Sequence, residues 1–161
     1  MNLPLGFAYS AVYAGIRQAR KDDLSLIVSG LPANAAAVFT QNRVQAAPVR
    51  LCRKHLKLSR GLVGAVLINA GNANCATRTG DAVAVATAKA AAKALRLPAP
   101  QVLPASTGVI GVELDPRKIT AALPQLISGL DPDRFPVAVL RDYTLPPRPF
   151  LPARLARYYR R

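Results

Sequence analysis

The most apolar run in this chain, residues 62–68 (LVGAVLI), constrains its fold more than any other feature. A short apolar run without alternation is typical of a strand buried on both faces, at the centre of a sheet. An alanine-rich segment follows at residues 80–95, with Asp81 near its start and Lys93 near its end, which is the charge polarity that a helix dipole favours. A central strand followed by such a helix predicts an α/β protein of packed α+β layers.

Four further segments carry strand signals. Residues 24–29 (LSLIVS) form an apolar run between an acidic pair and Gly30, which predicts a buried strand. Residues 36–40 (AAVFT) follow a short turn and predict a second strand, so that the two would form a hairpin. Residues 47–53 (APVRLCR) alternate in part and are a third candidate strand, and residues 101–103 form a short apolar run before the next helix.

That next helix is well marked at both ends. Asp115 followed by Pro116 is an N-cap and first-turn pair, and Gly129 is a stop signal, so we expect a helix through about Ser128. Pro124 lies inside this segment and is expected to bend or split the helix.

The totals bound the class of protein. The 161 residues fit one domain or a large piece of one, and 51% are hydrophobic, enough for a sizeable core. The net charge of +14 raises nucleic-acid binding as an alternative function, but the basic residues are scattered and form no stripe interleaved with aromatics, which argues against it. There is no secretory leader and no apolar run of membrane-spanning length, so we expect a cytoplasmic protein without a membrane partner.

The two cysteines do not define a metal site. Cys52 and His55 have the C-x-x-H spacing of metal ligands, but Cys75 is the only other candidate ligand of that kind, and three or four are needed. We therefore predict no metal and two reduced packing cysteines, with one disulfide as the alternative.

Residues 136–161 depart from the rest of the chain. They hold five of the 14 prolines and six arginines against one acid, Asp142, with no helical or strand period. We predict a domain boundary at residue 135, followed by an unrelated basic tail that is out of frame or disordered. The alternative is a basic extension that binds an acidic partner, in which case the chain would be an interaction protein.

Two polar clusters carry the chemistry. Asn69, Asn72 and Asn74 follow the central strand in a glycine-containing loop, a place where binding residues are common but which a turn would also explain. The polar residues after this loop lead to the N-terminus of the alanine-rich helix, which is suited to hold a carboxylate. In residues 105–111 (ASTGVIG), Thr107 and Gly108 place a hydroxyl beside a flexible backbone amide, which is suited to stabilise an oxyanion, although an ordinary strand exit has the same pattern.

Taken together, these residues resemble the N-terminal part of the glutamate N-acetyltransferase / ornithine acetyltransferase family of arginine biosynthesis. The resemblance covers roughly residues 1–135 and rests on four blocks in the same order: residues 6–17, residues 23–42, residues 69–74 (NAGNAN) and residues 106–111 (STGVIG). The co-occurrence of the blocks makes the match specific.

The resemblance implies a function and a fold. Members of this family transfer acetyl from N-acetylornithine to glutamate, some also use acetyl-CoA as a co-substrate, and none of this implies a bound cofactor. They cut themselves at an Ala-Thr bond, and the freed threonine forms an acyl-enzyme. Their oxyanion-stabilising pair corresponds to Thr107 and Gly108, and the implied fold is part of an α-β-β-α sandwich of two sheets covered by helices. Asn69, Asn72 and Asn74 are candidate substrate-binding residues.

The departures from the family are equally specific. Three features of the family have no counterpart here, because residues 136–161 stand in their place. They are the threonine-rich segment expected after Gly129, the substrate-contacting lysine that follows it in the family, and the Ala-Thr cleavage site. The resemblance therefore implies an enzyme that lacks its nucleophile and its second, β-chain. We expect the 161 residues alone to be inactive.

Overall fold

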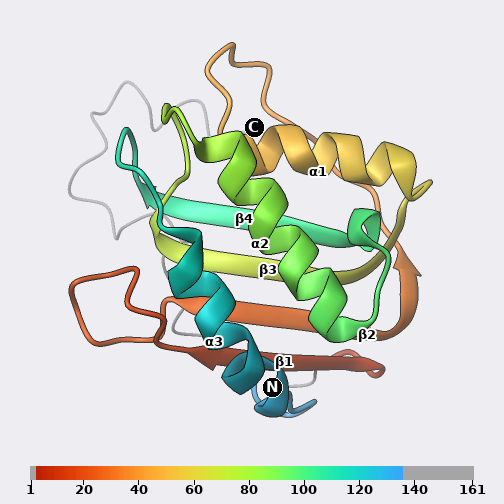
Figure 1. Cartoon of the computed structure of the whole chain (residues 1–161). Coiled ribbons are helices and arrows are strands. Elements are labelled where there is room, and N and C mark those ends of the chain that lie inside the picture. Colours follow the sequence, from red (N-terminus) through yellow and green to blue (C-terminus); the bar gives the residue numbers. More distant parts are fainter. Residues whose placement is uncertain (1–2, 136–161) are drawn as a thin grey trace, which may run out of the picture.

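The computed structural model describes residues 3–135 and contains one mixed sheet (Figure 1). Its strands are β1 (Phe7–Val12), β2 (Leu24–Asn34), β3 (Leu62–Asn72) and β4 (Val102–Val109), in the spatial order β1-β2-β3-β4. β1 and β2 pair antiparallel, as do β2 and β3, whereas β3 and β4 pair parallel. A parallel pair needs a crossover connection, and the chain between β3 and β4 provides it.

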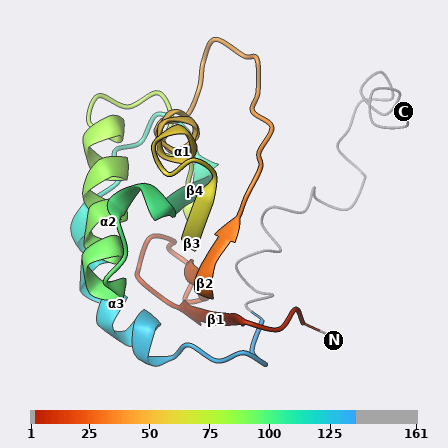
Figure 2. The ribbon, with the colours of Figure 1, turned by 90° about the vertical axis from the view of Figure 1, so that its right-hand side faces the viewer.

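Three α-helices accompany the sheet: α1 (Ala47–Leu58), α2 (Gly80–Leu95) and α3 (Pro116–Ser128). A 3-10 turn, η1 (Ala99–Gln101), leads from α2 into β4. α2 and α3 cover one face of the sheet, and α1 lies along its β4 edge (Figures 1 and 2). Within residues 3–135 no helix covers the opposite face, so the fold is one α–β half of the expected four-layer sandwich (Figure 2).

The main core lies between the sheet and the helices α2 and α3. It is built from aliphatic side chains of alternate strand positions and of one stripe on each helix: Leu24, Leu26, Ala65, Leu67, Val83, Ala91, Ala92, Val102, Ile119, Leu123 and Leu126. The alanines of α2 let this helix approach the sheet closely, since they add little side-chain volume. A second apolar cluster, around Ile68 and Ala70, lies on the helix-free face with Ala11, Ile27 and Ala105.

Several sequence predictions are confirmed. Residues 24–29 lie in β2, and residues 62–68 lie in β3, which is central and buried on both faces. Residues 80–95 form α2, and α3 begins after Asp115, whose carboxylate accepts a hydrogen bond from the Arg117 backbone N–H (2.9 Å). α3 is continuous through Pro124, so of the two expected effects of this proline the split was wrong, and the bend stays a prediction.

The predicted strand at residues 36–40, and with it the hairpin, was wrong. This segment is a loop with Val38 fully exposed, and the antiparallel partners of β2 are β1 and β3. Phe39 is held by the guanidinium of Arg53, which lies 5.1 Å from the ring centroid. An apolar composition alone does not make a strand where no neighbouring strand supplies hydrogen bonds.

The predicted strand at residues 47–53 was also wrong, since these residues begin α1. The residues that α1 buries are Ala47, Pro48, Leu51 and His55, at spacings of three and four, which is the helical period. Pro48 fits this assignment because proline is tolerated in the first turn of a helix. The apolar Val49 and Leu51 on either side of Arg50 imitated the alternation of a strand over too short a window.

β1 was not predicted, because only three of its six residues are buried. Residues 101–103 do lead into β4, which runs on to Val109. The predicted boundary at residue 135 stays a prediction, and the tail at residues 136–161 lies outside the described residues. Within residues 3–135 no helix is long and apolar enough to cross a membrane.

Candidate functional site

Thr107 and Gly108 lie near the C-terminal end of β4, directly beside the end of β3. The parallel register pairs Ala70 with Thr107 and Gly71 with Gly108. The strands therefore extend further than predicted: Asn69 and Asn72 belong to β3, and Thr107 and Gly108 belong to β4. The register thus places residues 69–72 beside residues 106–109, so that the two polar clusters lie close enough to form one site.

Backbone packing at this point leaves no room for a side chain. Gly108 has a φ of +129°, and a Cβ on it would lie 2.2 Å from the carbonyl carbon of Gly71 and 2.5 Å from the Asn72 nitrogen. Gly71 has a φ of +113° and faces Arg17, whose Cγ would lie 2.6 Å from a Cβ. Both positions need glycine for two reasons: the backbone has a positive φ, and a Cβ would collide with neighbouring atoms.

Asn69 joins the two strands. Its side chain is buried, its Oδ1 accepts a hydrogen bond from the Ser106 hydroxyl of β4, and its Nδ2 donates to the Asn72 carbonyl (2.8 Å). Ser106 immediately precedes Thr107, so the Asn69 amide fixes the strand end that carries the candidate oxyanion site. Substrate binding by Asn69 stays a prediction.

Asn72 and Asn74 organise the chain after β3. Asn72 donates to the Val112 carbonyl (3.0 Å) and accepts from the Asn74 backbone N–H (2.8 Å), and Asn74 donates from Nδ2 to the Gly80 carbonyl (2.9 Å). The Asn74 carbonyl accepts from the Ala47 N–H (3.1 Å), so this residue links β3 to the starts of both α1 and α2. Both side chains are buried, so the structure explains them as loop scaffolding, and their contact with substrate stays a prediction.

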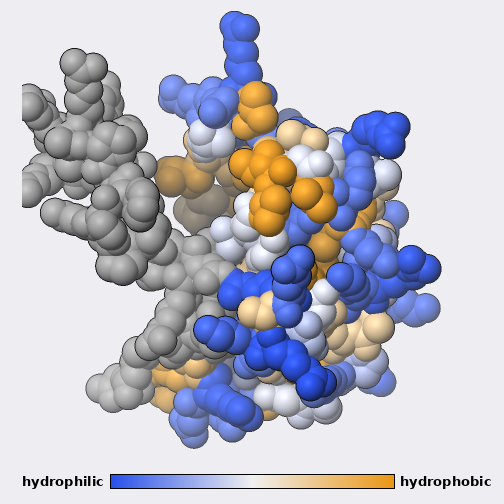
Figure 3. Space-filling view, turned by 90° about the vertical axis from the view of Figure 1, so that its left-hand side faces the viewer, coloured by the Kyte–Doolittle hydropathy of each residue, from blue (hydrophilic) through white to orange (hydrophobic). Residues whose placement is uncertain are grey.

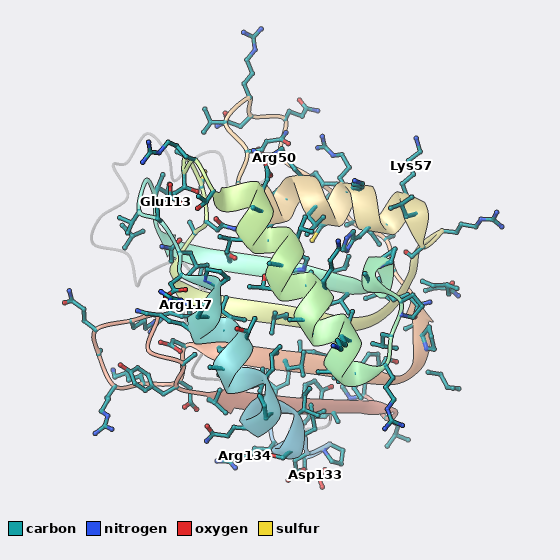
Figure 4. All side chains as sticks on the ribbon, in the orientation of Figure 1. Arg50, Lys57, Glu113, Arg117, Asp133 and Arg134 are labelled. Carbon is teal, nitrogen blue, oxygen red and sulfur yellow. The ribbon has the colours of Figure 1, made fainter. Side chains whose placement is uncertain are left out.

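The N-terminus of α2 does hold a carboxylate, and it belongs to the chain itself. Glu113, in the β4–α3 connection, accepts hydrogen bonds from the Arg78 backbone N–H (2.9 Å) and from the Thr79 hydroxyl. These hydrogen bonds, that of Thr79 first, lower the pKa of Glu113. Glu113 lies at the end of the sheet where α2 and α3 begin, near Arg117 (Figure 4).

The neighbouring loop is pinned by a buried acid that the sequence prediction missed. Asp23 has no exposed surface, and its carboxylate accepts hydrogen bonds from the backbone N–H groups of Ala14 (2.7 Å), Ile16 (2.7 Å) and Arg17 (2.9 Å). Three charge-assisted bonds hold this loop against Gly71. The sequence did offer a signal for Asp23, because an acid stands there between a glycine-containing loop and an apolar strand. It offered no comparable signal for the role of Glu113.

The C-x-x-H pair seals the edge of β4. Cys52 and His55 lie one turn apart on α1: the Cys52 thiol donates to the Pro104 carbonyl (3.0 Å), and His55 Nδ1 lies 2.8 Å from the Val102 carbonyl. Burial raises the pKa of Cys52 to about 11, so it is a poor nucleophile. Cys52 and Cys75 are both free thiols, and among residues 3–135 no three His, Cys, Asp or Glu side chains form a metal-binding group.

Comparison with known proteins places this arrangement in a family. The sequence profile of the ArgJ family matches residues 8–144. The arginine biosynthesis bifunctional protein ArgJ of Nitratidesulfovibrio vulgaris is 47% identical over 128 residues, which are 79% of this chain and 32% of that protein. The ArgJ protein of Thermus thermophilus is 44% identical over 149 residues, which are 91% of this chain and 38% of that protein. None of these relatives is described as a nucleic-acid-binding protein, so the comparisons do not favour that alternative.

A solved structure agrees with the sequence comparisons. The crystal structure of ornithine acetyltransferase complexed with ornithine from Mycobacterium tuberculosis superimposes with a TM-score of 0.75 and 35% identity, over 84% of this chain and 71% of that chain. The chain studied here spans about a third of the length of the curated relatives that it matches. With a profile match over most of its length, the chain belongs to the ArgJ family.

Proposed function

We propose that this chain supplies the oxyanion-stabilising part of an acetyltransferase of arginine biosynthesis, with Thr107 and Gly108 as the stabilising pair. The reaction is the transfer of acetyl from N-acetylornithine, or from acetyl-CoA, to glutamate. A threonine hydroxyl attacks the acetyl carbonyl, the carbonyl oxygen becomes an oxyanion, and its collapse expels the ornithine amine, which takes up the proton. The glutamate amine then attacks the acetyl-threonine, and collapse of a second oxyanion breaks the ester bond, releases N-acetylglutamate and returns the amine proton to the threonine oxygen.

The observation that carries this proposal is the backbone direction at the end of β4. The Val102 and Pro104 carbonyls point away from β3, since they bond with His55 and Cys52 of α1. Polar groups of a strand alternate in direction, so the Gly108 N–H is expected on the same outer edge, beyond the part that α1 covers. The Thr107 hydroxyl, which makes no hydrogen bond within residues 3–135, is its immediate neighbour. A free amide beside a free hydroxyl is the donor pair that an oxyanion needs.

The nucleophile has to come from another polypeptide segment. In residues 3–135 the Thr79 hydroxyl does donate to a carboxylate, that of Glu113, but the lowered pKa of Glu113 makes this carboxylate a weak base. Thr107 is assigned to the stabilising pair. Two matches of similar extent cover very different shares of the matched chains. The match over 84% of this chain covers 71% of the solved M. tuberculosis chain. The match over 86% of this chain covers only 33% of the Synechococcus relative. That solved chain is thus about half as long as a curated relative, which supports the idea that members work as two chains.

The test is reconstitution of acetyl transfer. The 161-residue chain is co-expressed with the C-terminal part of the N. vulgaris relative, and conversion of N-acetylornithine and glutamate to ornithine and N-acetylglutamate is measured. Activity is expected only with both parts, and Thr107→Ala is expected to lower kcat about 100-fold or more. Thr120→Ala on α3 is the matched control and should keep full activity. Transfer by the 161 residues alone, or an undiminished Thr107→Ala complex, would overturn the proposal.

A further inference from the structure

A cavity of about 540 Å³ lies beside the candidate oxyanion site, on the helix side of the sheet. Its walls include Ile16 and Arg17 of the loop after β1, Gly71 of β3, Val109 and Val112 of the β4–α3 connection, and Lys118 of α3. Thr107 does not line the cavity, and it shares a face of β4 with Ala105, two residues earlier, which belongs to the helix-free cluster. The cavity is therefore a second place, distinct from the acetyl-transfer chemistry proposed above.

Both walls of the cavity are fixed by buried polar side chains. Asp23 holds the loop that carries Ile16 and Arg17 through three backbone hydrogen bonds. Asn72 holds the opposite wall through the Val112 carbonyl, and the Ala73 N–H donates to the Val109 carbonyl (2.9 Å). A concave space whose walls are held in this way is preformed, and its volume is typical of small-molecule sites.

The cavity is lined by two basic side chains, Arg17 and Lys118, and by two acidic ones, Glu113 and Asp115. The Lys118 ammonium donates to the Gly15 carbonyl (2.6 Å) and keeps two further donors. The two carboxylates at the rim are already engaged: Asp115 pairs with the guanidinium of Arg117 (3.0 Å), and Glu113 accepts from residues 78 and 79. Lys118 therefore has donors left with which to bind a single negative charge.

The remaining wall is apolar and partly open to solvent. Val109 is 56% exposed and Val112 is 52% exposed, although both belong to a backbone segment fixed by hydrogen bonds. Viewed from this end of the molecule, hydrophobic residues gather among hydrophilic ones (Figure 3). Rigid, exposed valines beside an ammonium suit a ligand with an aliphatic body and one anionic head.

We propose that this cavity binds a small aliphatic monocarboxylate, with its carboxylate on the Lys118 ammonium and its aliphatic chain against Val109 and Val112. Inorganic phosphate would satisfy Lys118 but leave the valines exposed, and an aliphatic amine would be repelled by Lys118. Because Gly71 and Val109 flank Gly108 in the sheet, the ligand would contact the same backbone that carries the candidate oxyanion donor.

The test is a titration of the ¹⁵N-labelled 161-residue chain, followed by amide chemical shifts, with pentanoate as the probe. Pentanoate is expected to shift the amides of Gly71, Val109 and Val112 in a saturable way, whereas pentylamine and phosphate at equal ionic strength should not. Lys118→Met is expected to weaken the Kd at least tenfold, and so is Val112→Glu, which leaves the Lys118 bond to Gly15 in place.

Lys57→Met is the matched control, since Lys57 lies at the far end of α1 (Figure 4), and it should bind pentanoate as the unaltered chain does. Thermal unfolding of each variant confirms that it is folded. Equal competition by phosphate, saturable binding of pentylamine, or unchanged binding by folded Lys118→Met and Val112→Glu would overturn the site. The titration involves no acetyl transfer, so its result is independent of the reconstitution experiment.

Discussion

Gly108 of β4 lies against Gly71 of β3 so closely that the missing Cβ of Gly108 would fall 2.2 Å from the Gly71 carbonyl carbon. Real Cβ atoms do not approach backbone at that distance, and neither backbone can move without breaking the parallel ladder. The candidate oxyanion amide is therefore positioned by a contact between two glycines rather than by a side chain.

The first prediction concerns that contact. Gly108→Ala is expected to destabilise the fold by at least about 3 kcal/mol, because it combines left-handed strain with a backbone clash. Gly111→Ala is the matched control: its φ is +80°, but nothing lies within 4 Å of the new Cβ, so it should cost only about 1–2 kcal/mol. Urea unfolding of both variants measures the difference. Equal losses would mean that φ alone, and not contact, requires glycine at position 108.

Asp23 is predicted to stabilise the loop beside Gly71. Asp23→Asn replaces an acceptor of three backbone N–H bonds by a neutral amide, and we expect a loss of about 3 kcal/mol in the free energy of unfolding. Amide exchange of Ile16 and Arg17 should accelerate at the same time. Asp22→Asn, one residue away and without such bonds, should change little. An Asp23→Asn chain as stable as Asp22→Asn would show that the loop is held by packing.

The clamp of Glu113 predicts a dependence on pH. The hydrogen bonds of Glu113 lower its pKa below the ordinary value of 4.5, so the folded state binds this proton less readily than the unfolded state does. The stabilisation is therefore present above pH 4.5 and is lost as the pH falls through the lower, folded-state pKa. Glu113→Gln should be less stable than the unaltered chain at pH 7, and the difference should shrink in acid. Both chains keep Asp115, so a constant difference from pH 7 to pH 3 would exclude the carboxylate as its source.

Cys52 is predicted to be unreactive in the folded chain. A rise of its pKa from 9.0 to about 11 lowers the thiolate fraction at pH 8 about 100-fold. In a Cys75→Ala chain, alkylation by iodoacetamide at pH 8 should be slower by at least this factor than in the same chain unfolded in urea. Similar rates in both states would mean that the Cys52 bond to the Pro104 carbonyl does not persist.

The sequence was most informative where the signals were local. The ends of α2 and α3 followed from Gly80, Asp115, Pro116 and Gly129, because caps and stop signals act within a few residues. The segments that misled, residues 36–40 and 47–53, are short, and a short apolar run fits a loop, a strand or a helix until its neighbours are known.

The candidate site, too, could be predicted only in part from the sequence. Thr107, Gly108 and the three asparagines were found as residue types, and the register of β3 and β4 brings Asn69 and Asn72 to Thr107 and Gly108. Their hydrogen-bond partners could not be predicted, since the Val112 carbonyl, the Gly80 carbonyl and the Ser106 hydroxyl reach them only through the tertiary fold. The edge-sealing role of Cys52 and His55 likewise depends on β4, about 50 residues away in sequence.

The parallel pairing of β3 with β4 also bears on how this molecule acquires its site in time. Asn69 and Ser106 are 37 residues apart, and they meet only after α2 has crossed over the sheet and β4 has aligned. Such non-local closure is slow compared with the formation of helices and hairpins. A nascent chain released before residue 102 can form β1, β2 and β3 but none of the backbone that carries Gly108. Assembly of the candidate site is thus a late folding event, and substitutions that delay closure of the crossover should lower the yield of competent molecules more than they lower the stability of those that form.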